Sequence, residues 1–112
     1  MTEASVVSIL GGSRALGRRV RTPIEMAELI EAGIRHSVAQ RLRERLKLTE
    51  RELAEGLGVS GKTLQRLAKR RSARLTPAQG DRLYRLARLV ALAEEVFEDR
   101  ERAHQWLRQP QR

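Results

Sequence analysis

Cysteine is absent from this 112-residue chain, and aromatic residues are scarce. Without cysteine, disulfide bonds and thiolate-bound zinc are excluded, and a reducing compartment such as the cytoplasm is favoured. One Phe, one Tyr and one Trp cannot fill a core, which must therefore consist mainly of Leu, Val, Ile and Ala. The apolar stretch Val6–Leu10 is interrupted by Ser8 and is too short for a signal peptide or a membrane span. We therefore expect a cytoplasmic protein without a membrane partner.

Acidic residues are the minority among the charged ones. The 14 Asp and Glu residues face 23 Lys and Arg residues, which gives a formal net charge of +9. Such an excess favours an anionic partner, with nucleic acid as the first candidate and an anionic membrane as the second. The length allows one domain, or one domain with an extension.

Alternation of apolar and polar residues with a period of two is weak and confined to Val6–Leu10, so the chain is predicted to be all-α. Helix starts are indicated by N-cap residues, some followed by Pro at N1 and by Glu or Gln at N3. These signals stand at Thr22-Pro23-Ile24-Glu25, Thr49 with Glu52, Ser60, Thr76-Pro77-Ala78-Gln79, and Asp99. A further helix is predicted over Ser37–Leu46. The helix after Thr76 should be long, to about Phe97, and the last should run through Leu107.

The helix after Thr22 should end at Gly33 and pack on the core through one face. We expect Ile24, Ala27 and Ile30 to point inward, with Met26 and Leu29 as further candidates for that face.

The stretch Thr49–Ala68, TERELAEGLGVSGKTLQRLA, has the spacing of a helix-turn-helix. Its apolar positions are Leu53, Ala54 and Leu57 on a first helix, Val59 in the turn, and Leu64 and Leu67 on a second helix. Gly58 permits the sharp turn because glycine tolerates a positive φ. The alternative is an ordinary helical hairpin without a DNA role. It is disfavoured because residues 60–75 hold six basic residues and no acidic one, whereas a solvated helix usually mixes signs.

The candidate DNA contacts lie on and just after the second helix. They are Ser60, Lys62, Thr63, Gln65, Arg66, Lys69, Arg70 and Arg71. Lys62 and Arg66 suit guanine O6 and N7, and Gln65 suits N6 and N7 of adenine. Ser60 and Thr63 are assigned to phosphate or base. The late residues Lys69, Arg70 and Arg71 are assigned to phosphates. Non-specific phosphate contact stays open for each of these residues.

Catalytic and metal-binding patterns are missing. Gly12 and Gly17 have the spacing of a phosphate loop, but Arg18 and Arg19 stand where Lys and then Ser or Thr are needed. The two histidines, residues 36 and 104, lie far apart and lack ligands at metal-like spacing. The acidic residues at 94–101 are interpreted as a solvated helix end. We therefore expect no enzyme activity, no cofactor and no metal.

The predicted long helix has an apolar arc wider than one contact needs. One stripe consists of Leu83, Leu86, Ala87, Val90, Ala93 and Phe97. Leu89, Leu92 and Val96 widen the arc well beyond the usual extent of roughly 100°. The surplus face is expected to bind a second copy of the chain or another protein. The alternative is that the final helix, with Trp106 as a packing anchor, folds back and covers it.

A known family combines these features. The segment ELAEGLGVSGKTLQRLAKRR is followed by Arg74-Leu75-Thr76-Pro77, Asp81-Arg82-Leu83 and Leu86-Ala87-Arg88. Ala93 with Val96-Phe97, and Ala103 with Trp106-Leu107 and Pro110, extend the pattern, as do Ile9-Leu10-Gly11-Gly12 and Gly33. Over nearly its whole length the chain resembles the ParS/Xre-type antitoxins.

The resemblance implies a type II antitoxin that pairs with a NAD-degrading RES-domain toxin and represses its own operon by binding operator DNA as a homodimer. It implies that Ser60, Lys62, Thr63, Gln65 and Arg66 face DNA, and that Leu89, Leu92, Val96 and Trp106 lie at the dimer or toxin interface. The expected organisation is a basic arm over residues 1–21 with loose first residues, a helix-turn-helix domain over 22–75, and a dimerisation and partial toxin-binding segment over 76–112.

Members of that family continue past the Trp-Leu…Pro segment into a Gly-rich turn and further helices, whereas this chain ends at Arg112. We therefore expect a truncated toxin-binding domain, through engineering, proteolysis or a short natural form, with operator binding retained and toxin neutralisation lost. Two other interpretations stay open. One is a plain helix-turn-helix transcriptional regulator without a toxin, and the other is a protein-interaction module whose basic surface binds an acidic protein.

Overall fold

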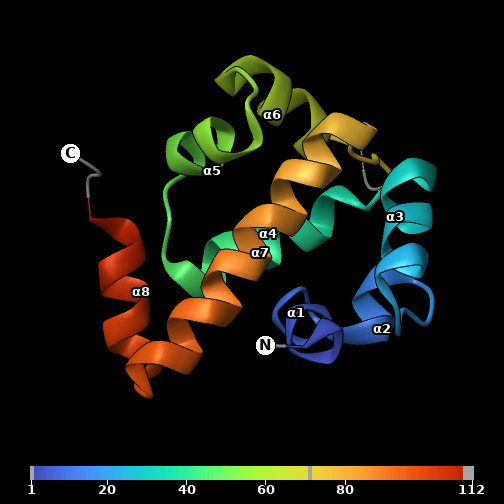
Figure 1. The fold of residues 1–112 in the computed structure, drawn as a ribbon. Coiled ribbons are helices and arrows are strands. Elements are labelled where there is room, and N and C mark those ends of the chain that lie inside the picture. The colour runs from blue at the N-terminus through green and yellow to red at the C-terminus, as the bar shows by residue number, and fades with distance from the viewer. Residues whose placement is uncertain (1, 71, 110–112) are drawn as a thin grey trace.

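The computed structural model describes residues 2–70 and 72–109, and the regular elements of this part are helices (Figure 1). They are α1 (Glu3–Ile9), α2 (Gly12–Leu16), α3 (Pro23–Ala32), α4 (His36–Leu46), α5 (Glu50–Leu57), α6 (Gly61–Ala68), α7 (Pro77–Phe97) and α8 (Arg100–Arg108). The predicted all-α class is confirmed, with the helix-turn-helix formed by α5 and α6. Within the described residues, no helix is both long and apolar enough to cross a membrane.

Side-chain caps determine where six of these helices begin, and the sequence predicted five of them, the caps of α3, α5, α6, α7 and α8. In each case the side chain of the N-cap residue accepts a backbone N–H of the first turn. Thr22, Thr49 and Thr76 form complete capping boxes, in which the side chain of the third helical residue accepts the N–H of the cap in return. Ser60 and Asp99 cap α6 and α8 without this reciprocal bond.

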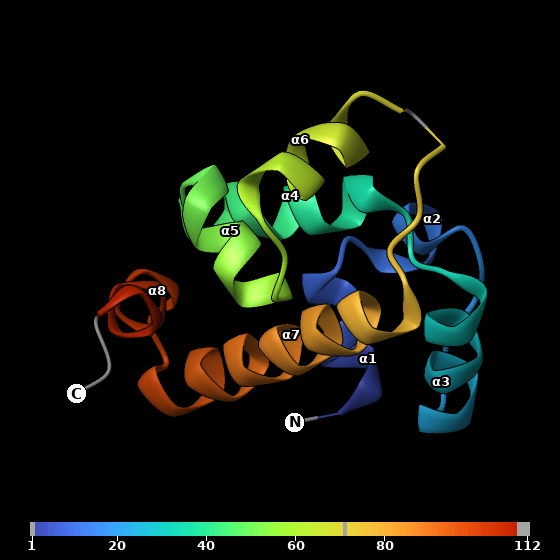
Figure 2. The ribbon, with the colours of Figure 1, turned by 90° about the horizontal axis from the view of Figure 1, so that it is seen from above.

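The long helix α7 is the element on which most of the fold is assembled (Figure 2). α1, α3, α5 and α8 all contact it, and α6 packs on α5. Leu83, Ala87 and Val90 of α7 are fully buried between these helices. Removing such apolar side chains from water is the main driving force for folding, so the wide apolar arc of α7 determines the architecture.

The N-terminal segment belongs to the core. Leu10 and Leu16 are buried, and α1 packs directly on α7. The Tyr84 hydroxyl of α7 donates a hydrogen bond of 2.7 Å to the carboxylate of Glu3. The expectation of loose first residues is therefore wrong for residues 3–9, because their apolar side chains have helical spacing and find a partner in α7.

The inward face of α3 differs from the expected one. Met26 and Leu29 are buried and Ile30 is half-buried, whereas Ala27 is exposed and Ile24 is 72% exposed. Apolar residues at five of seven consecutive positions allow two overlapping faces, and contact with α7 selects the one centred on Met26 and Leu29.

A short backbone bridge joins the start of α4 to the segment that follows α6. Arg35 and Arg74 are paired in antiparallel fashion, through backbone hydrogen bonds of 3.0 and 2.7 Å made by their neighbours. The Arg74 guanidinium also donates to the Gly33 carbonyl at 2.8 Å. These bonds fix the exit of the helix-turn-helix against the rest of the fold.

The last helix folds back against α7 and α4. Ala103 and His104 of α8 are buried. His104 Nε2 lies 2.7 Å from a carboxylate oxygen of Glu94 on α7. Nη2 of Arg45, on α4, donates to both oxygens of the same carboxylate at 3.0 and 3.2 Å. One carboxylate therefore links three helices.

Candidate nucleic-acid interface

The turn between α5 and α6 has the geometry that a helix-turn-helix requires. Gly58 ends α5 with a φ of +71°, and the Val59 N–H donates to the Ala54 carbonyl at 2.9 Å. Leu57 and Leu64 are buried between the two helices. A Cβ added at Gly58 would lie 2.8 Å from Nε of Arg82, so the Arg82 side chain would have to shift, and the positive φ itself disfavours any residue but glycine.

The polar residues predicted on α6 are mostly exposed. Ser60, Lys62, Gln65, Arg66, Lys69 and Arg70 are exposed, and Thr63 is half-buried. Arg71 lies outside the described residues, as does Pro110. The Ser60 hydroxyl accepts the Thr63 N–H at 3.1 Å and donates to the Thr63 hydroxyl at 3.0 Å, so both side chains are engaged in capping α6.

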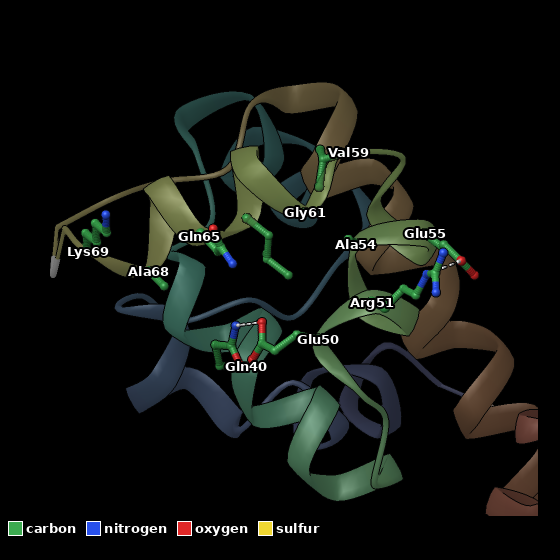
Figure 3. A pocket seen from close by; sticks show the side chains of 11 residues that line it. Gln40, Glu50, Arg51, Ala54, Glu55, Val59, Gly61, Gln65, Ala68 and Lys69 are labelled. Atoms are coloured by element: carbon green, nitrogen blue, oxygen red, sulfur yellow. Dashed lines mark hydrogen bonds and ion pairs between the residues drawn. The ribbon is translucent and has the colours of Figure 1, made fainter.

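An open groove of about 790 Å³ runs between α6, α5 and α4 (Figure 3). Its apolar floor consists of Ala54, Val59, Leu64 and Ala68. Its rim consists of Gln40, Glu50, Arg51, Glu55, Gly61, Gln65 and Lys69. Figure 3 shows Gln65 across the hollow from a hydrogen-bonded pair, in which Gln40 Nε2 donates to Glu50 at 3.3 Å. The second turn of α6 therefore faces polar groups that come from two other helices.

A second groove, of about 430 Å³, lies on the other side of α6, between that helix and the start of α7. Three arginines line it, Arg66 and Arg70 from α6 and its end, and Arg74 from the bridge. Thr63 and Thr76 add hydroxyl groups. The side chains of α6 are thus presented between two hollows, one with mixed polar groups and one strongly basic.

The positive charge of α6 is not neutralised within the described residues. Lys62, Arg66, Lys69 and Arg70 make no ion pair there. The acidic residues across the first groove are engaged on their own side, since Glu50 pairs with Arg43 at 3.0 Å and Glu55 pairs with Arg51 at 3.9 Å. A polyanion approaching α6 therefore meets cations without competing internal partners.

Sequence reasoning missed the residues that α4, α5 and the bridge add to this surface. Gln40, Glu50, Arg51 and Arg74 all line one of the two grooves. The only available signal was the acid-free run through residue 75, which includes Arg74. The other three reach the surface through the packing of α4 and α5, which periodicity does not reveal.

An apolar stripe remains exposed on α7 although α8 has folded back. Leu89, Leu92 and Val96 are 43, 47 and 67% exposed and share one face of the helix. Trp106 of α8 is 41% exposed and packs beside Phe97, with ring centroids 5.8 Å apart. The final helix therefore folds back, as one of the two alternatives from the sequence expected, but it covers only the face that bears Ala93 and leaves the stripe exposed.

The described residues hold no cluster of side chains suited to a metal ion. The buried His36 has its pKa lowered by burial, against the opposing charge of Glu50, and its Nε2 lies 3.3 Å from Nε2 of Gln40. His104 is paired with Glu94. Both histidines therefore have structural partners within the fold.

Comparison with protein families gives a match that includes all the residues lining the two grooves. The model for the antitoxin Xre-like helix-turn-helix domain matches residues 25–88, which is more than half of the chain and includes α4, α5 and α6. No significant match was found among curated proteins or among solved structures.

Proposed function

The chain belongs to the family of antitoxin Xre-like helix-turn-helix domains, and we propose that it binds operator DNA as an autorepressor and pairs with a NAD-degrading RES-domain toxin. In this proposal residues 22–75 form the DNA-binding domain. Residues 76–112 provide the contacts to a second copy and to the toxin, and residues 1–21 pack against both parts.

The observation that carries the DNA-binding proposal is the unpaired positive charge of α6. Lys62, Arg66, Lys69 and Arg70 are exposed and lack ion pairs among the described residues. Each phosphate that such a cation neutralises releases condensed counterions, which favours binding at low salt. A helix that served only as a solvated surface would mix its charges.

Base contacts are assigned to exposed polar residues of α6. The N-terminal residues of a recognition helix enter the major groove, where Arg or Lys pairs with guanine and Gln with adenine. We assign these roles to Lys62, Gln65 and Arg66. Ser60 and Thr63 orient the helix through their mutual capping bonds, and the hydrogen-bonding positions of their hydroxyl groups that these bonds leave unused are available to phosphate.

A salt titration tests the phosphate contacts. With a fluorescent duplex from the region upstream of the gene, Lys69→Ala and Arg70→Ala should each lower the slope of log affinity against log salt by about 0.9. Arg102→Ala is the matched control, because Arg102 is exposed on α8 and has no ion pair within the described part of the chain. Slopes equal to that of the control would contradict the phosphate role.

The exposed stripe on α7 supports the dimer and toxin contacts. Leu89, Leu92 and Val96 form a continuous apolar face, and Trp106 adds an amphipathic aromatic beside it, a residue type enriched at interface hot spots. A two-fold homodimer would place two copies of α6 on successive half-sites of a palindromic operator. The resemblance to ParS/Xre antitoxins is the support for a RES-domain toxin as the second partner.

Oligomeric state tests the stripe. Light scattering at high micromolar concentration should give a dimer for the wild type and a folded monomer for Leu92→Glu. Ile24→Glu is the control, since Ile24 is also exposed but lies on α3. A monomeric wild type would refute the dimer.

Toxin pairing is tested with a RES-type protein encoded beside this gene. The wild type should retain it in a pull-down, and Val96→Glu should weaken retention. If no RES-type gene lies beside this one, a plain transcriptional regulator is favoured instead.

A further inference from the structure

Two stretches of the chain without acidic residues meet on the side of the molecule away from α7. Residues 4–24 contain no Asp or Glu, and neither do residues 32–43. The first includes α2 and the second includes the start of α4, and these two helices contact each other. Figure 2 shows α2 and α4 on the side away from α7, where α6 also lies, and Figure 1 shows α6 at the opposite end of the molecule from α2.

Arginine side chains of the second stretch lie against the two glycines that bound α2. A Cβ added at Gly11 would lie 3.0 Å from Nη1 of Arg41, and one added at Gly17 would lie 2.9 Å from Nη2 of Arg35. Both glycines have a positive φ, which already disfavours other residues. The guanidinium groups thus lie close to the two glycines at the ends of α2, although both arginines remain exposed overall.

This surface is continuous with the basic groove beside α6. The antiparallel bridge pairs Arg35 with Arg74, and paired residues of a bridge have neighbouring side chains on the same face. Arg74 lines the groove together with Arg66 and Arg70. A path of guanidinium groups therefore leads from α6 through the bridge to the start of α4.

The cations along this path are largely available to an external anion. Among the described residues, Arg14, Arg35 and Arg41 make no ion pair and are exposed. Arg18 is engaged with Glu28 at 3.6 Å, in a contact that is itself partly exposed.

We propose that α2 and the start of α4 form a second phosphate-binding surface, named here the α2–α4 surface and defined by Arg14, Arg35 and Arg41, which grips the duplex backbone that flanks the major groove occupied by α6. The inference rests on the proposed DNA binding and extends it. The partner is the same duplex, because the path begins at the helix that enters the groove and a B-form backbone carries one negative charge about every 1.7 Å of helix axis. Contacts of this kind set register and affinity without reading sequence.

The test is a salt titration on a 30-base-pair duplex of random sequence. Arg14→Ala and Arg41→Ala should each lower the slope of log affinity against log salt by about 0.9, the amount expected for one lost phosphate contact. Arg14 is exposed and makes no ion pair within the described fold, so its variant separates charge from stability. Because the Arg41 guanidinium lies against Gly11, Arg41→Lys is added and should restore most of the slope.

Two comparisons make the result decisive. Arg102→Ala removes the same charge from α8 and should leave the slope unchanged. Lys69→Ala is titrated in parallel and measures the contribution of the proposed phosphate contact at the end of α6. If Lys69→Ala lowers the slope while Arg14→Ala and Arg41→Ala match the Arg102→Ala control, the α2–α4 surface is refuted and the proposed function stands. If the wild type does not bind the duplex, the proposed function itself fails, and the inference with it.

Discussion

Replacing Glu94 by Gln tests how the last helix is held on the rest of the fold. The Glu94 carboxylate accepts two hydrogen bonds from Nη2 of Arg45, at 3.0 and 3.2 Å, and one from Nε2 of His104, at 2.7 Å. Its side chain is 19% exposed, and that of His104 is 6% exposed. Burial of this carboxyl opposes its ionisation, but the hydrogen bonds from His104 and Arg45 and their charges outweigh that effect and lower the pKa of Glu94.

The expected loss of stability in Glu94→Gln follows from these contacts. A hydrogen bond to a charged group contributes about 1.5–3 kcal/mol, and loss of one partner of a buried ion pair costs more than a surface pair does. In Glu94→Gln the negative charge disappears, while Arg45 stays in place. Nε of Arg45 already lacks a hydrogen-bond partner within the described residues. We expect the free energy of unfolding to fall by about 2–4 kcal/mol and Tm to fall by roughly 10 °C, at about 4 °C per kcal/mol.

The assay is urea unfolding followed by far-ultraviolet circular dichroism at pH 7, with Glu55→Gln as the matched control. Glu55 pairs with Arg51 at 3.9 Å, and both side chains are largely exposed, so the same substitution there should change stability by less than about 0.5 kcal/mol. If the two variants were equally stable, Glu94 would not hold α8 in place, and the ionic link among α4, α7 and α8 would be refuted.

Two further predictions concern stability. Gly58→Ala should destabilise the fold by about 1–3 kcal/mol, because φ is +71° and the new Cβ would lie 2.8 Å from Arg82. The control is Gly61→Ala, whose new Cβ meets nothing within 4 Å and should not destabilise the fold. Equal decreases in Tm for the two variants would contradict the role of Gly58 in the turn. Burial lowers the pKa of His36 below its ordinary 6.5, so the unfolded chain binds the proton first and the free energy of unfolding should fall as the pH drops through 6.5. The pKa of Glu94 is also lowered in the folded state, so the free energy of unfolding should fall further below about pH 4.5. Unfolding free energies that stay constant from pH 8 to pH 4 would refute both assignments.

Local signals were sufficient for helices α3 to α8 and for the helix-turn-helix. The N-caps at Thr49, Ser60 and Thr76 act through bonds that span three residues, so the sequence alone places them. The role of Gly58 could also be predicted from the sequence, because the turn needs a positive φ that glycine adopts freely. The apolar residues of α5 and α6 then identified the motif without knowledge of the rest of the fold.

Features that depend on contacts between distant segments could not be predicted from the sequence. The order of residues 3–9 comes from packing on α7, as the bond between Glu3 and Tyr84 illustrates. The inward face of α3 was ambiguous because Ile24 and Met26 belong to overlapping apolar arcs, and the position of α7 decides between them. Gln40 reaches the groove beside α6 for the same reason, since the packing of α4 against α5 places it there.

Sequence-dependent binding to duplex DNA tests the central claim most directly. Affinities are compared at one salt concentration for a duplex from the region upstream of the gene and for a scrambled duplex of the same composition. We expect the wild type to prefer the upstream duplex by about 1,000-fold or more. Gln65→Ala and Arg66→Ala should each lose about 1–3 kcal/mol on that duplex and much less on the scrambled one. Equal affinity of the wild type for both duplexes, or no affinity for either, would contradict the assignment of α6 as the helix that reads operator DNA.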